Sequence, residues 1–496
     1  MTHMSPEEFR RYGHQSVDWI ADYWMRLESL PVAPDLIPGQ IRQKLPDHPP
    51  EHGEPFEALL GDMDDVIVPG LLHWQHPRFF GYFPANTSGP AVLADLLSAG
   101  LGVQGMSWAT SPACTELEQH VLDWLAEILE LPGRFRFDGP GGGVIQDTAS
   151  SAVLVAIVAA LHRASRGRVR NDGVEPQQYA LYVTLEAHSA ATKAAIITGL
   201  GEQAVRYVRT HPVTMALDVA HLDALVSQDL AAGITPLLTV ATVGTTSTAA
   251  VDPVADIGRI CRKYGIWLHV DAAYAGVAAV CPELRWLNDG VAEYADSYCT
   301  NPHKWLLTNF DCDAFWVADR RWLTDALTIL PEYLRNAPSE SGMVTDYRNW
   351  QVPLGRRFRA LKLWAVLRWY GVEGLRRHIR QGVGLAAQFA QWIRVDDRFE
   401  ISAPHHLSLV CFRLRPTQGA NPNSMNLDLL ARVNASGITF LTHTKIRDEV
   451  VLRIAVGGTF TELRHAKQSW QWIQQAATQL QAENGRTISM KMTPGE

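Results

Sequence analysis

The alternation of apolar and polar positions changes character twice along the chain. Between about residues 87 and 341, short apolar runs alternate with amphipathic stretches. The runs predict strands and the stretches predict helices, at 143–145, 179–184, 236–242 and 266–270 and at 151–164 and 254–264, respectively. Strands that alternate with helices are typical of a parallel α/β sheet, and such sheets bind ligands beyond the carboxyl ends of their strands.

The two flanking regions follow other patterns. Near the start, Phe9, Val17 and Trp24 recur at helical spacing before a proline-rich stretch at 46–55, and this segment has little core of its own. It is therefore expected to pack on something else, a second subunit being one option. After residue 357 come further predicted elements: helices at 358–370 and 373–395, strands at 407–414 and 450–455, and a closing helix at 461–483. The sequence thus predicts three parts, 1–86, 87–360 and 361–496.

Composition narrows the class of protein. The chain has 496 residues, a formal charge of −8 and 47% hydrophobic residues, which fits a large core and argues against binding nucleic acid or an anionic membrane. Its six cysteines lack the spacing of a zinc site, and their scatter is typical of a reducing compartment. No apolar stretch is long enough to cross a bilayer, and the first residues lack a signal region. We expect a cytoplasmic protein without a bound metal.

Two charged residues follow predicted strands. Asp271 comes directly after the buried run 266–270, where a carboxylate is costly unless it is paired; an N-cap or a structural ion pair explains it as well as a catalytic role. Lys304 stands among apolar and aromatic neighbours, and a desolvated lysine becomes the nucleophilic amine that imine chemistry needs. For Lys304 alone, a surface side chain extending past Trp305 is the simpler interpretation.

Three further polar segments also follow strands. The glycine-rich run 141–143 leads to Thr148, Ala149 and Ser150 at a predicted helix start, which suits a phosphate but also an ordinary N-cap. His188 and Thr246 each follow another strand, and each taken singly is more simply structural. Together with Asp271 and Lys304, these are the parts of a pyridoxal phosphate site. The phosphate would lie at the helix start, the lysine would take the aldehyde and the acid would keep the pyridine nitrogen protonated.

At these residues the chain resembles the group II pyridoxal-phosphate-dependent decarboxylases, and most of all the aromatic-L-amino-acid decarboxylases of the tryptophan, tyrosine and DOPA type. The resemblance covers about residues 5–480. It is densest in HWQHPRFFGYFPANTS (73–88), SWATSPACTELEQHVLDWL (107–125), GVIQDTAS (143–150), LHVDAAYAG (268–276), NPHKWLLTNFDC (301–312) and DYRNWQVPLGRRFRALKLW (346–364). It implies a fold-type I α/β enzyme with a mainly parallel central sheet and a small α+β C-terminal domain. It also implies a homodimer, with the helical N-terminal segment packed on the partner subunit.

The resemblance further implies a role for each site residue. Lys304 forms the covalent link to the cofactor, pyridoxal 5'-phosphate, while Asp271 pairs with the pyridinium and His188 stacks on the ring. Ala273 packs on the opposite ring face and Thr246 lies beside the cofactor. The residues implied around the phosphate are Thr148, Ala149, Ser150, Asn301 and His303.

Two positions bear on the product. Tyr333 lies where the family has a mobile catalytic loop that closes over the site of the partner subunit, and the resemblance implies that it protonates Cα after carbon dioxide leaves. In related aldehyde synthases this tyrosine is replaced by phenylalanine, or the stacking histidine by asparagine. Because Tyr333 and His188 are both present, the sequence predicts an amine product; an aromatic acetaldehyde synthase is the alternative.

The resemblance also implies a substrate pocket. Around the substrate side chain it places Trp74, Tyr82, Phe83 and Pro84, together with Gln104 and Met106 from the partner subunit. An aromatic box suits a flat ring, although ordinary core packing explains some of these residues equally well. In plant relatives, glycine at the place of Gly355 goes with indole substrates and serine with phenols. Tryptophan is therefore favoured, with 5-hydroxytryptophan, DOPA, tyrosine and phenylalanine as companions.

Two other functions compete with this interpretation. A glutamate- or histidine-type decarboxylase shares the fold, but an acidic substrate needs a cationic pocket and the run 79–84 is aromatic. A cofactor-binding protein without activity would be favoured by a missing lysine or acid, whereas Lys304 and Asp271 are both present.

Overall fold

Seven buried strands form the central sheet of the protein. The computed structural model describes residues 3–335, 337–416 and 421–492, except for the side chains of 333 and 484–492. The strands of this sheet, in the order β1-β7-β6-β5-β4-β2-β3, have these bounds: β1 Gly142–Gln146, β7 Asp313–Val317, β6 Ser297–Thr300, β5 Trp267–Asp271, β4 Thr235–Thr242, β2 Tyr179–Thr184 and β3 Val205–Val208. Neighbours from β3 to β6 run parallel, and β7 runs antiparallel to β1 and β6. The predicted mainly parallel sheet is confirmed.

The pattern of apolar residues located four of these seven strands. It missed β3, β6 and β7, which are short or begin with a polar residue: β6 reads SYCT and β7 reads DAFWV. Because parallel strands share one direction, the ends of β4, β5 and β6 lie at the same edge, where Thr242 is opposite Asp271 and Asp271 is opposite Cys299. This edge is called the carboxyl edge below.

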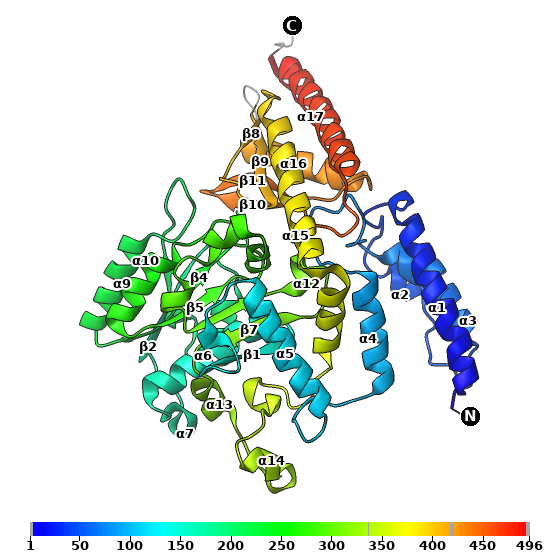
Figure 1. Cartoon of the computed structure of the whole chain (residues 1–496). Coiled ribbons are helices and arrows are strands. Elements are labelled where there is room, and N and C mark those ends of the chain that lie inside the picture. The colour runs from blue at the N-terminus through cyan, green and yellow to red at the C-terminus, as the bar shows by residue number, and fades with distance from the viewer. Residues whose placement is uncertain (1–2, 336, 417–420, 493–496) are drawn as a thin grey trace. The chain divides into compact units, whose positions relative to one another are not determined.

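Helices rich in small apolar residues cover the sheet. The helix α6 (Ala149–Ser165) packs on strands β1 and β4 to β7, with α8 (Ala190–Ile197) and α13 (Arg321–Leu327) beside it. The helices α9 (Val219–Ala231) and α10 (Val254–Tyr264) lie side by side on β4 (Figure 1). The remaining helices of this region are α4 (Gly89–Leu101), α5 (Pro112–Ile128), α7 (Val169–Asp172), α11 (Val291–Tyr294), α12 (Pro302–Trp305) and α14 (Ala337–Glu340).

The long element α15 (Arg359–Arg394) contains a break at the place that the sequence predicts. Gly371 has φ +60° and ψ 174°, values that interrupt a helix and favour glycine. The two predicted helices 358–370 and 373–395 are therefore confirmed as two segments joined at this glycine.

The chain divides into two compact units. The α/β unit comprises Ala85–Ala387 and Ala403–Cys411, and the small unit comprises Met1–Pro84, Gln388–Ser402 and Phe412–Glu496. The small unit thus joins both ends of the chain, with Phe80 N donating to Phe440 O at 2.9 Å. The N-terminal segment packs on the C-terminal segment of the same chain, and its packing on a partner subunit stays a prediction. The three-part division at residues 86 and 360 stays a prediction.

The small unit contains a second, antiparallel sheet, except for residues 409–411 of that sheet, which fall in the α/β unit. Its helices are α1 (Pro6–Arg26), α2 (Gln40–Lys44), α3 (Phe56–Asp62), α16 (Pro422–Ala435) and α17 (Leu463–Met492). Its sheet has the order β10-β11-β9-β8, with bounds Thr442–Ile446, Glu449–Ala455, Leu409–Leu414 and Phe399–Ile401, where the sequence predicted only two strands. Within the described residues, none of the helices has both the length and the apolar character that crossing a bilayer requires.

Candidate active site

Lys304 lies at the carboxyl edge of the large sheet, on the short helix α12 that follows β6 directly. Its neighbour Trp305 is fully buried and stacks on Tyr274 at 5.3 Å between ring centroids. Burial lowers the pKa of Lys304, and the carboxylate of Asp271 opposes that shift. This environment favours the neutral amine, the form of lysine that attacks a carbonyl carbon. The interpretation of Lys304 as a surface side chain does not fit these surroundings.

Asp271 ends β5 and faces the same edge. Its Oδ1 accepts a hydrogen bond from Ala273 N at 3.0 Å, and the thiol of Cys299 lies 3.9 Å from the same oxygen. Both of these local contacts of Asp271 therefore involve its Oδ1. The negative charge of Asp271 raises the pKa of both Lys304 and His188, which places the three groups in one electrostatic neighbourhood.

His188 follows β2 and is held in one orientation by a local bond. Its Nδ1 accepts a hydrogen bond from Ala190 N at 3.1 Å, so the neutral ring carries its proton on Nε2. Burial lowers the pKa of His188, and the positive charge of Lys304 lowers it further. An uncharged, partly buried ring is suited to stacking on an aromatic group.

The turn between β1 and α6 presents backbone N–H groups to the carboxyl edge. Asp147 Oδ1 accepts from Thr148 N at 2.6 Å, and Thr148 is the N-cap residue of α6. The Thr148 side chain makes no capping bond to the described helix. The first N–H groups of a helix, here those of Ala149 and Ser150, lack partners within the helix, and its dipole favours an anion there. Thr148 is thus an N-cap residue whose side chain leaves the first N–H groups of the helix to another acceptor, and a phosphate fits this place.

Asn301 and His303 flank Lys304 and are both buried. Asn301 N donates to Ala273 O at 3.0 Å, whereas Asn301 Oδ1 is buried and has no hydrogen-bond partner in the described part of the chain. His303 Nδ1 accepts from Cys312 N at 2.9 Å, and burial lowers the pKa of His303 to about 3. A buried amide oxygen without a partner, close to a helix start and a buried lysine, indicates that a polar group binds here. These residues fit pyridoxal phosphate.

Two other predicted cofactor neighbours differ in exposure. Ala273 is buried two residues after Asp271, consistent with packing against a ring. Thr246 is exposed in the turn after β4. Tyr333 has its backbone in a 3₁₀ turn, Glu332–Leu334, and its side chain lies outside the described residues.

Three predicted substrate residues lie together in the α/β unit. A Cβ added at Gly355 would lie 3.3 Å from Gln104 Nε2, and Gln104 Oε1 accepts from Arg356 N at 2.6 Å. Met106 O accepts from Arg348 N at 2.9 Å. Gln104 and Gly355 therefore form one contact, which the sequence did not predict.

The other four predicted substrate residues belong to the small unit. Trp74 and Tyr82 stack at 5.2 Å between ring centroids, and Arg453 lies over the Phe83 ring at 5.4 Å. Trp74 is 38% exposed and Tyr82 is 50% exposed, whereas Phe83 and Pro84 are buried. Trp74 and Tyr82 thus present half-open aromatic faces.

Comparison with known proteins matches this geometry. A family model described as the pyridoxal-dependent decarboxylase conserved domain matches residues 38–415. The chain belongs to the pyridoxal-dependent decarboxylase family. The decarboxylase is 47% identical to a phenylacetaldehyde synthase of Arabidopsis thaliana over 96% of this chain and 97% of that protein. It is 45% identical to the aromatic-L-amino-acid decarboxylase of Bos taurus over 98% and 100% of the two chains.

A solved structure gives the same assignment. The crystal structure of Oryza sativa TDC with PLP and tryptamine matches with a TM-score of 0.94 and 40% identity, covering 97% of this chain and 99% of that one. The decarboxylase is a carboxy-lyase of the aromatic-L-amino-acid decarboxylase family, and its cofactor is pyridoxal 5'-phosphate. When bound, this cofactor supplies an electron sink for the breaking of a bond at Cα.

The structure adds residues of the decarboxylase that the sequence interpretation missed. Asp313 begins β7 with a fully buried carboxyl group, and only its position at the head of an apolar run could have signalled it. Glu118 and Arg356 form a buried ion pair with contacts of 2.6 and 3.0 Å. Glu118 also accepts from Ile145 N on β1, so the pair fixes the Gly355 segment against that strand.

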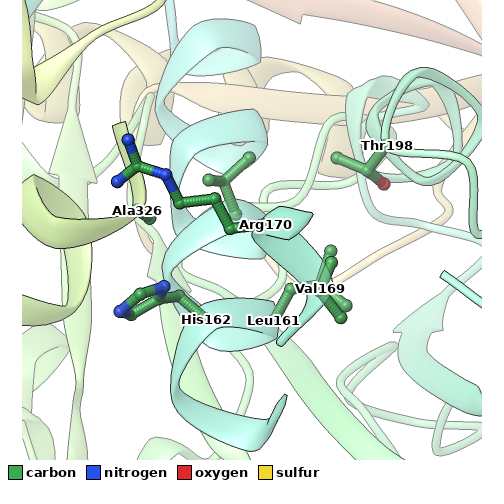
Figure 2. A pocket seen from close by; sticks show the side chains of 7 residues that line it. Leu161, His162, Val169, Arg170, Thr198 and Ala326 are labelled. Carbon is green, nitrogen blue, oxygen red and sulfur yellow. The ribbon is translucent and has the colours of Figure 1, made fainter. Parts of the chain in front are cut away.

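A separate pocket of about 170 Å³ in the decarboxylase contains none of the predicted site residues. It lies among α6, α7, α8 and α13, where Figure 2 shows His162, Arg170 and Ala326 near one another. Arg170 donates to the backbone oxygens of Asp325 and Thr328. The arginine therefore ties two helical segments together, and we assign the pocket no part in the chemistry.

Proposed function

We propose that the protein converts aromatic L-amino acids, with tryptophan favoured, to the corresponding amine and carbon dioxide. The arrangement at the carboxyl edge supports this proposal: a desolvated lysine, an acid at the end of a strand and an uncharged histidine act on one another electrostatically. Each has a distinct task toward a bound pyridoxal group and an amino acid.

The tasks follow from charge and burial. Lys304, whose pKa burial lowers, would hold the cofactor through its amine and would give up that place to the amino group of the substrate. The carboxylate of Asp271 would favour a protonated pyridine nitrogen, because an opposite charge at contact stabilises the charged form. His188 would stack on the cofactor, and the start of α6 with Asn301 and His303 would hold its phosphate. Tyr333 returns a proton to Cα.

The presence of both His188 and Tyr333 carries the proposal of an amine product. The competing function is an aromatic acetaldehyde synthase, which the 47% identity to a phenylacetaldehyde synthase favours. Purified protein is incubated with tryptophan, tyrosine and phenylalanine while carbon dioxide, amine, aldehyde, ammonia and peroxide are measured together. Amine in amounts equal to carbon dioxide is expected. Aldehyde as the main product, with ammonia and peroxide, would overturn the proposal.

The contact between Gly355 and Gln104 joins two residues that the proposal assigns to the substrate pocket. A serine at 355 presses on the Gln104 amide, because 3.3 Å is closer than most side-chain contacts. Gly355→Ser is expected to lower kcat/KM for tryptophan relative to tyrosine by about 10-fold or more. Gly384→Ser is the control, since nothing lies within 4 Å of a Cβ there. An unchanged ratio of kcat/KM for tryptophan and tyrosine in Gly355→Ser would show that this residue does not set the substrate preference.

A homodimer belongs to the same proposal. On α4, Leu93, Leu96, Leu97 and Leu101 are 47–63% exposed, and exposed leucines clustered on one helix are typical of a surface that a partner covers. Sedimentation of the purified protein at twice the mass of the chain is expected. Leu97→Glu is expected to shift the population toward monomer, with Glu116→Gln on α5 as a control. A monomer with full activity would contradict the dimer.

A further inference from the structure

Asp313 is a buried acid that the proposed chemistry leaves without a task. Its side chain has no exposed surface, and neither carboxyl oxygen has a hydrogen-bond partner among the described residues. An ionised carboxylate without such bonds is expensive to bury, so the neutral acid is the favoured form. Burial accordingly raises the pKa of Asp313 well above its ordinary value.

The register of the sheet places Asp313 beneath the proposed phosphate site. Asp313 lies opposite Gln146 at the end of β1, two residues before Thr148. On the other side, Ala314 lies opposite Thr300, so the next residues along the two strands are Asp313 and Asn301. The acid therefore adjoins both segments that are proposed to bind the phosphate.

Charged and titratable groups from several neighbouring segments act on Asp313, among them the thiol of Cys312 directly before it. Asp271 from β5 and Asp147 from the turn after β1 disfavour its ionised form, and Lys304 from α12 favours it. The Cys299 thiol of β6 also interacts electrostatically with Asp313, and burial raises the pKa of that thiol well above its ordinary value. Two carboxyl groups, Asp271 and Asp147, thus oppose one ammonium.

We infer that Asp313 is a protonation-dependent gate on cofactor retention: the site holds the phosphate only while this carboxyl is neutral. The inference rests on the proposed phosphate position. An ionised Asp313 would add a negative charge beside a group that is itself anionic. By linkage, binding of the phosphate favours the protonated acid, and loss of that proton weakens binding.

The test uses full-length protein freed of cofactor and titrated with pyridoxamine 5'-phosphate, whose amine cannot condense with Lys304. Affinity is measured by tryptophan fluorescence from about pH 6.5 to about pH 10. For the unmodified protein we expect affinity to fall by up to about tenfold per pH unit once Asp313 ionises. Asp313→Asn is expected to bind pyridoxamine 5'-phosphate equally well at neutral pH. Its affinity should not show the decrease that ionisation of Asp313 causes in the unmodified protein. Asp289→Asn, at an exposed acid of the same unit, should behave as the unmodified protein.

The outcomes separate this inference from the proposed function. An equally steep fall in Asp313→Asn, or weak binding by that variant at neutral pH with an unchanged circular dichroism spectrum, overturns the gate. Asp313→Ser replaces the asparagine variant if the latter fails to fold. No binding of pyridoxamine 5'-phosphate or pyridoxal 5'-phosphate by the unmodified protein would instead contradict the proposed site itself.

Discussion

The carboxyl edge of the large sheet and the aromatic cluster of the small unit are organised differently. At the carboxyl edge, Lys304, Asp271 and Asp313 are drawn together by strand register and interact through charge. In the small unit, Trp74 and Tyr82 are stacked and half exposed, and their contact is apolar. Buried charges interact strongly and depend on each partner, whereas an exposed ring pair contributes little by itself. Substitutions at the carboxyl edge are therefore expected to have larger effects than substitutions in the aromatic cluster.

The largest effect is expected at Lys304. Lys304→Ala removes the buried amine that interacts electrostatically with Asp271, so the visible absorbance of the bound cofactor should disappear. The rate of carbon dioxide release should fall at least about a thousandfold. Lys193→Ala, on α8, serves as the control and should retain the absorbance. Survival of the absorbance in Lys304→Ala would disprove the assignment.

Breaking the ion pair of Glu118 and Arg356 tests whether the carboxyl edge depends on buried support. Arg356→Ala leaves a buried carboxylate without its partner, and the free energy of unfolding should fall by about 3–5 kcal/mol. Denaturant titration measures the loss. Arg380→Ala, which breaks an exposed pair with Glu283, should cost less than about 1 kcal/mol. Equal losses of unfolding free energy in the two variants would show that the buried ion pair stabilises the fold no more than the exposed one.

Asp271→Asn is expected to weaken catalysis without removing the covalent link. Loss of the opposite charge should lower kcat by about 10- to 1,000-fold, which corresponds to a pKa shift of about 1–3 units. The visible absorbance should persist while its pH dependence changes. A variant with unaltered kcat would show that the strand-end acid is only structural.

A pH dependence of stability follows from His303. Burial lowers its pKa from 6.5 to about 3, so the unfolded chain takes up a proton in this range and the folded one does not. The free energy of unfolding should therefore fall as pH drops below 6.5, by up to about 1.4 kcal/mol per pH unit. His303→Gln should flatten this slope, and a change at the exposed His52 should not. An unaltered slope in His303→Gln would mean that another group dominates.

The smallest effect is expected in the aromatic cluster. Trp74→Ala removes a ring stacked on Tyr82, a contact of about 0.5–1.5 kcal/mol. The KM for aromatic substrates should rise by a few-fold at constant kcat, and Trp369→Ala, an exposed ring elsewhere, should leave both unchanged. A fall in kcat for Trp74→Ala as large as that for Asp271→Asn would show that the aromatic cluster affects the chemistry as strongly as the carboxyl edge does.

The long regular elements and the residue types of the candidate site could be predicted from the amino-acid sequence. Apolar periodicity located β2, α10 and the two segments of α15, because these elements are long or fully apolar and carry their signal locally. The positions of Asp271, Lys304 and His188 after predicted strands also followed from the sequence, since chain order fixes which residue comes next.

Which of these residues meet depends on the tertiary fold. The antiparallel course of β7, the place of Asp313 opposite Gln146 and the contact of Gln104 with Gly355 all join segments that are far apart in the chain. Strand order and register arise from packing of the whole sheet. A short run such as DAFWV does not indicate by itself which strands will pair with it. The sequence indicated the candidate groups, and burial in the fold shifts the pKa values of Lys304 and His188.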